Sequence, residues 1–169
     1  MNNISRSSKN SIKLITRCGV LIALSAIGAM IKIQGTIAFD SMPGYFAAIY
    51  ISPIAGAIVA GLGHFLTAIT SGFPMSLPMH LMLMVVMGIV AYIFGFIGNK
   101  INGVIACVVA TILNGPVCTV IAAITAKALG LPFSGAAMFT ALVVPLTIAS
   151  AINIVLAFIV YMIIRNKRI

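Results

Sequence analysis

The chain has 169 residues, of which ten are Lys or Arg and one, Asp40, is acidic, giving a formal charge of +9. Hydrophobic residues make up 62% of the chain and charged residues 7%, whereas soluble domains are about 45–50% apolar and about 25% charged. Such a chain cannot cover a water-facing surface, so we predict an integral membrane protein. A single acid also excludes catalytic carboxylate pairs and carboxylate cages for divalent cations.

Two further function classes are disfavoured. The sequence has no Gly-x-x-x-x-Gly-Lys phosphate-binding loop, so we do not expect this chain to hydrolyse ATP. Its basic residues gather near the termini, which indicates membrane orientation rather than nucleic-acid binding.

Apolar runs bounded by Pro, Gly and polar residues predict six membrane helices in one membrane domain, 1–169. About 20 apolar residues are needed to cross the hydrocarbon core, and the second run is short for this. A basic tail, residues 1–11, is expected to lie in the cytoplasm before the first helix. The predicted helices are 12–33, 36–52, 53–71, 79–98, 104–126 and 136–164.

Three basic clusters predict the topology, because Lys and Arg concentrate on the cytoplasmic side. The first cluster and the Lys100 turn must then be separated by an even number of crossings. Segment 36–52 therefore counts as a crossing, partly re-entrant, and both termini are cytoplasmic. The clusters are Arg6, Lys9, Lys13 and Arg17, then Lys100, then Arg165, Lys167 and Arg168.

Polar side chains inside apolar helices are candidates for binding, because they are costly in the membrane and usually face the bundle interior. His64 and Thr67 share one face of their predicted helix at the spacing i, i+3. Together with residues of the outward loops, they predict a polar cavity that opens outward. The candidate substrate-binding residues are Asp40, Tyr45, His64, Thr67, Phe73, His80, Asn114 and Asn153.

Several of these candidates also have a structural interpretation. Asp40 can pair with Lys32 at the membrane interface or accept hydrogen bonds from sugar hydroxyls. Asn114 precedes Gly115 and Pro116, so it can satisfy carbonyls that the proline leaves free. Asn153 can join two helices by hydrogen bonds.

The aromatic and histidine candidates have alternatives too. Tyr45 and Phe73 are interfacial anchors or stack on an aromatic ligand. His64 and His80 lack a third ligand nearby, so we expect neither a metal site nor a cofactor.

The first helix carries a possible docking motif. Gly19 and Ala23 form a small-x-x-x-small pair near the predicted cytoplasmic end, where a partner helix can approach closely.

These segments suggest a family. The run 16–25, Thr-Arg-Cys-Gly-Val-Leu-Ile-Ala-Leu-Ser, resembles the first helix of the S components of energy-coupling factor (ECF) vitamin transporters. In that family an Ala-x-x-x-Ala element docks the T subunit, and Gly19 stands here in place of the first Ala. Segments 39–48, 63–68 and 72–80 are most similar to the α-ribazole transporter subgroup.

The resemblance implies an all-α membrane protein of six transmembrane helices in a bacterial plasma membrane. Such a protein captures a vitamin or precursor outside and topples in the membrane to release it inside. A T subunit and two ATPase subunits supply the energy, so the chain itself is neither an enzyme nor a cofactor protein. For α-ribazole, a cobalamin precursor, Asp40 or Asn114 would meet the ribose, and the aromatic and histidine candidates would meet the base.

Alternatives remain at this stage. Riboflavin, pantothenate and a queuosine precursor fit the same reasoning. A stand-alone secondary transporter or small channel would need an ion-coupling group, for which only the two histidines and Asp40 are present. A membrane enzyme with a histidine base is disfavoured, since no Ser or Cys accompanies His64 or His80 at a suggestive spacing.

Overall fold

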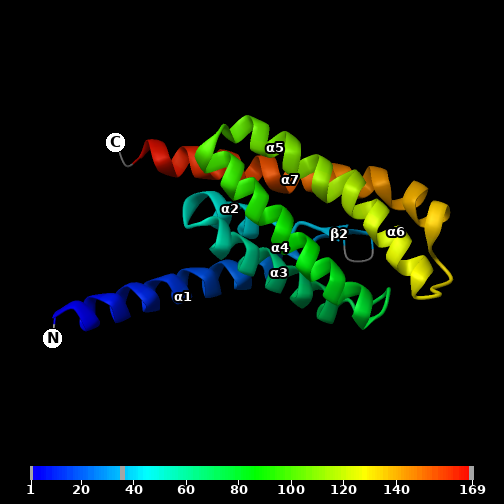
Figure 1. The fold of residues 1–169 in the computed structure, drawn as a ribbon, viewed down its shortest axis with the longest axis horizontal. Coiled ribbons are helices and arrows are strands. Elements are labelled where there is room, and N and C mark those ends of the chain that lie inside the picture. Colours follow the sequence, from blue (N-terminus) through cyan, green and yellow to red (C-terminus); the bar gives the residue numbers. More distant parts are fainter. Residues whose placement is uncertain (1, 35–36, 168–169) are drawn as a thin grey trace.

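A computed structural model describes residues 2–34 and 37–167, without the side chains of residues 2–10 and 32–34 (Figure 1). It is a bundle of helices with one short hairpin of two strands between the first two helices. A π-helical segment, η1 (Leu113–Val117), joins α5 to α6. The helices are α1 (Asn2–Gly28), α2 (Met42–Tyr50), α3 (Pro53–Thr70), α4 (Leu77–Lys100), α5 (Gly103–Ile112), α6 (Cys118–Ala128) and α7 (Gly135–Asn166).

The first helix differs from its predicted range, 12–33. It begins at Asn2, so the predicted tail 1–11 is helical from its second residue, and it ends at Gly28. Residues 32–34 instead form β1 (Lys32–Gln34), which pairs with β2 (Ile37–Ala38) in antiparallel fashion. A Cβ at Gly28 would collide with the backbone carbonyl of Phe39, so this glycine lets the returning chain pass the end of α1.

Parts of the predictions lie outside the described residues. The predicted second helix starts at Thr36, which is outside the described range. The side chains of Arg6, Lys9 and Lys32 are not described either, and Arg168 lies beyond residue 167. The predicted Asp40–Lys32 pair therefore stays a prediction.

The predicted helix 36–52 is much shorter in the structure. Its helical part is α2, nine residues with Pro43 in the first turn, which rise only about 13 Å. The preceding stretch is extended because it forms the hairpin and the turn at Asp40 and Ser41. Within the described residues, five helices are long and apolar enough to cross a membrane, and α2 is not among them.

The other four predicted helices agree with the structure within two residues at each end. Counting α5, η1 and α6 as one helix gives six helices in the described part of the chain. Both ends of the described chain and the α4–α5 turn lie at the left of Figure 1, as the shared side of the basic clusters requires. Their cytoplasmic location stays a prediction.

Two apolar clusters hold the bundle together. Tyr45 and Phe94 pack edge to face, with ring centroids 5.4 Å apart, in the cluster that joins α2, α3, α4, α5 and α7. Met79 and Met138 belong to the second cluster, which joins α4, α6 and α7. By contrast, α1 packs mainly on α2 and α3 in the described structure and leaves most of its span exposed.

Small residues bring α2 into close contact with its neighbours. A Cβ at Gly44 would lie 2.7 Å from Cα of Ala60, and a Cβ at Gly56 would collide with the backbone of Ala48. A Cβ at Gly95 would lie 2.5 Å from the Ala48 carbonyl oxygen. Helices in membranes associate through such close packing, so these glycines fix α2 between α3 and α4.

We predict that Gly56→Ala destabilises the protein by about 1–3 kcal/mol, because the added methyl group meets backbone atoms that cannot move aside. The measurement is the thermal unfolding midpoint in detergent micelles. Gly19→Ala is the matched control, since nothing lies within 4 Å of a Cβ at Gly19. Equal midpoints for the two variants would contradict the close contact.

Candidate functional site

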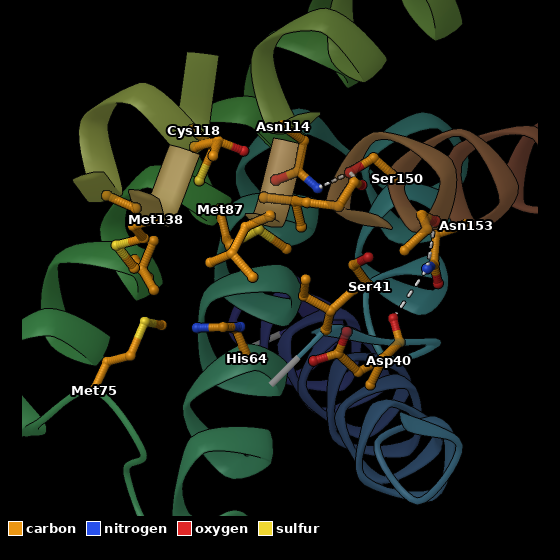
Figure 2. A pocket seen from close by; sticks show the side chains of 18 residues that line it. Asp40, Ser41, His64, Met75, Met87, Asn114, Cys118, Met138, Ser150 and Asn153 are labelled. Carbon is orange, nitrogen blue, oxygen red and sulfur yellow. Dashed lines mark hydrogen bonds between the residues drawn. The ribbon is translucent and has the colours of Figure 1, made fainter. Parts of the chain in front are cut away.

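A cavity of about 70 Å³ lies beside the second apolar cluster, which supplies part of its lining (Figure 2). Its walls come from the α1–α2 connection, α3, α4, the loop before α4, η1, α6 and α7. The apolar lining includes Met75, Leu83, Met87, Met138, Leu142 and Leu146. The polar lining consists of Asp40, Ser41, His64, Asn114, Thr119, Ser150 and Asn153.

Asn153 ties the α1–α2 connection to α7. Its amide nitrogen donates to the Ala38 carbonyl at 3.2 Å and to the Ala149 carbonyl at 2.9 Å, and its oxygen accepts from the Met42 backbone N–H at 2.9 Å. Asn153 is 1% exposed, and both of its N–H bonds are used. It therefore positions the segment that carries Asp40 and Ser41.

Asp40 is the only acidic residue of the chain and is 4% exposed. The Thr67 hydroxyl on α3 donates to Asp40 Oδ2 at 2.5 Å. Asp40 lies outside the five candidate membrane helices. Burial raises the pKa of its carboxyl to about 6, although the hydrogen bond from Thr67 lowers it. A carboxylate in this setting retains lone pairs that can accept further hydrogen bonds.

Asn114 lies in η1, where the helix widens at Pro116. The Ser150 hydroxyl donates to the Leu146 carbonyl at 2.6 Å, so it can only accept from Asn114 Nδ2, at 2.8 Å. This fixes the amide orientation. Asn114 Oδ1 is buried without a hydrogen-bond partner in the described structure, and the amide does not bind carbonyls freed by Pro116.

A row of rings extends from the cavity to the loop between α3 and α4. His64 lines the cavity, and its ring centroid lies 5.6 Å from that of His80. Phe73 lies 5.9 Å from His80, measured between ring centroids, and is partly exposed. His64 Nε2 and both ring nitrogens of His80 have no hydrogen-bond partner among the described residues.

The structure brings four of the predicted residues to the cavity wall, Asp40, His64, Asn114 and Asn153. Thr67 lies behind Asp40, and His80 and Phe73 lie behind His64. Tyr45 does not line the cavity; it is fully buried against Phe94.

Other lining residues were not among the candidate residues. Ser150 precedes Asn153 by three positions on α7 and lies on the same polar helix face. Ser41, beside Asp40, could have been found by its position. Met75, Met87 and Met138 lie in apolar segments and carry no signal that separates them from the other methionines.

The predicted docking pair lies on an open face. Gly19 and Ala23 are exposed on α1, and only 6% of the span Ser11–Gly28 is buried. No described part of the chain covers this face at Gly19.

The comparisons with known proteins agree with this arrangement. The family described as ECF transporter, substrate-specific component, matches residues 13–165, nearly the whole chain. No curated protein and no solved structure matches it.

The chain therefore belongs to the family of ECF transporter substrate-specific components. It is a multi-pass membrane protein and the substrate-specific subunit of an importer rather than an enzyme. Its partners are the T subunit and ATPase subunits of that importer, together with a small-molecule substrate.

The buried Asp40 predicts a pH-dependent stability. Its carboxyl titrates near pH 4 in an unfolded chain and near pH 6 in the folded protein, so the folded state binds the proton more tightly. The contribution of Asp40 to stability is then fully present below about pH 4 and is lost as the pH rises through about 6, by up to about 3 kcal/mol. Thermal unfolding in detergent from pH 4 to pH 8 measures this fall.

Asp40→Asn keeps an oxygen that accepts from Thr67 and removes the charge. The variant should exceed the parent protein in stability at pH 8, and the excess should shrink toward pH 4. An excess that does not change with pH would contradict the buried, titrating carboxyl.

Proposed function

We propose that this chain is the S component that captures α-ribazole for import across a bacterial plasma membrane. The carrying observation is the cavity, which combines an apolar wall with a few polar groups. Such a wall suits a ligand that joins an apolar aromatic base to a ribose. The similarity of segments 39–48, 63–68 and 72–80 to the α-ribazole subgroup supports the same substrate.

In this proposal Asp40 and Asn114 accept hydrogen bonds from the ribose hydroxyls, and His64 contacts the base. Asn153 and Thr67 act as positioning residues, since their polar groups are used within the protein. His80 and Phe73 support His64 from the side of the α3–α4 loop. Tyr45 is assigned to packing between α2 and α4.

The substrate must also enlarge the cavity. A cavity of about 150 Å³ holds one benzene ring, whereas this one has about 70 Å³. Three methionines in its wall, Met75, Met87 and Met138, have long unbranched side chains that adapt their shape. We expect these side chains to move aside when the base enters.

We predict that Asn114→Ala weakens α-ribazole binding by about tenfold or more, because a buried acceptor for a substrate hydroxyl is lost. Calorimetry with purified protein in detergent measures the affinity. Asn166→Ala, at the exposed end of α7, is the matched control and should bind as the parent does.

The same measurement applies to Asp40→Ala and His64→Ala, for which we expect losses of similar size. His80→Ala should have a smaller effect, because His80 touches His64 and not the cavity. Unchanged affinity in the Asp40, His64 and Asn114 variants together would refute the site.

We further propose that Gly19 and Ala23 dock the T subunit. Replacing either by Leu should abolish uptake in cells that contain the complete transporter, because the bulky side chain blocks close helix approach. Binding by the purified variant should persist. Ala141→Leu, an exposed small residue of α7, serves as the control, and equal loss of uptake and binding would argue against docking.

A further inference from the structure

An acidic side chain lines the cavity, and no described basic side chain does. Asp40 is the only acid of the chain and lines the cavity. Among the side chains that the structure describes, no Lys or Arg lines it, since those basic side chains are exposed at other positions. The cavity therefore carries a negative charge with no described cation to balance it.

The wall also presents hydrogen-bond acceptors that the protein leaves open to a ligand. The hydrogen bond from Asn114 Nδ2 to Ser150 fixes the orientation of the Asn114 amide. In this orientation Asn114 Oδ1 meets no donor in the described structure. Asp40 accepts from Thr67 and keeps acceptor capacity on its carboxylate. The Thr119 hydroxyl is used by the Gly115 carbonyl, at 2.7 Å. Two acceptors of the wall, Asn114 Oδ1 and the Asp40 carboxylate, are therefore open to donors on a ligand.

Asn114 and His64 are buried side chains of the cavity wall with unpaired polar atoms. Asn114 is 2% exposed and His64 is 8% exposed, each with a polar atom that has no hydrogen-bond partner in the described structure. Buried polar atoms are normally paired, so unpaired atoms in a cavity wall indicate groups that a ligand satisfies.

We propose that the substrate of this chain is uncharged or cationic and presents hydroxyl or N–H donors to Asp40 and Asn114. It carries no carboxylate or phosphate. The inference rests on the proposed function, in that this cavity takes the imported substrate, but it does not require that the substrate be α-ribazole.

The physical reason is like-charge repulsion in a poorly solvated site. An anion in the cavity lies within a few ångströms of the Asp40 carboxylate, where water screens little and no described cation compensates. A carboxylate or phosphate also lacks the donors that Asn114 Oδ1 requires. Among the substrates considered above, pantothenate is thereby excluded, while α-ribazole, riboflavin and an amine-bearing queuosine precursor remain.

The test uses matched pairs that differ by one phosphate. Purified full-length protein at pH 8, where histidines are neutral, is titrated with α-ribazole, α-ribazole 5′-phosphate, riboflavin, riboflavin 5′-phosphate and pantothenate. For the pair that binds, we expect the phosphate to bind at least about 100-fold more weakly than its uncharged partner. In the Asp40→Asn variant, the ratio of the two dissociation constants should shrink by about tenfold or more, because the charge that repels the phosphate is gone.

The outcomes separate the two proposals. Binding of riboflavin without α-ribazole refutes the proposed substrate and supports the charge class. Tightest binding by a phosphate or by pantothenate overturns the charge class, as does failure of every uncharged member to bind. If Asp40→Asn does not fold, the ratio within each pair for the parent protein decides alone.

Discussion

The side-chain amide of Asn153 holds the chain before α2 against the middle of α7. It pairs with a carbonyl at Ala38 and an N–H at Met42, so both ends of the segment that contains Asp40 are fixed. Buried backbone polar groups outside regular secondary structure need partners within the protein, and Asn153 supplies them here. The cavity wall, the buried carboxyl and the short α2 all depend on this tie.

Close packing and local widening then shape the cavity. Gly44, Gly56 and Gly95 let α2 pack closely between α3 and α4, and the connection before α2 lines the cavity with Ile37, Ala38, Asp40 and Ser41. On the opposite side, η1 places Asn114 toward Ser150 of α7. π-helical turns occur frequently at functional sites, and here the turn carries the unpaired acceptor.

Much of this arrangement could be predicted from residue patterns. Long apolar runs identify α3, α4, α7 and the helix formed by α5, η1 and α6, because a bilayer requires about 20 apolar residues. Parity of the basic clusters predicted a membrane crossing at residues 36–52, but the helical part of this stretch, α2, is only nine residues long and is not among the five candidate spans of the described structure. The end of α1 at Gly28 and the hairpin could not be predicted, since Ile31 and Ile33 continue the apolar run and only the close approach of Phe39 explains the stop. Among the candidate residues, Tyr45 shows the limit, because an aromatic residue in α2 can face either a ligand or the core.

By itself, the sequence determined that this is a basic, multi-pass membrane protein with one acid, no phosphate-binding loop and a few polar residues within its helices. Those conclusions rest on hydropathy and charge, which act residue by residue. Only the tertiary structure decided which polar atoms remain unpaired. The partners of Asn114, Asn153 and Asp40 come from segments far apart in the chain. Hydrogen bonds of that kind depend on three-dimensional packing, so no local pattern could show that the polar groups of Asn153 are all used within the protein while Asn114 Oδ1 has no partner in the described structure.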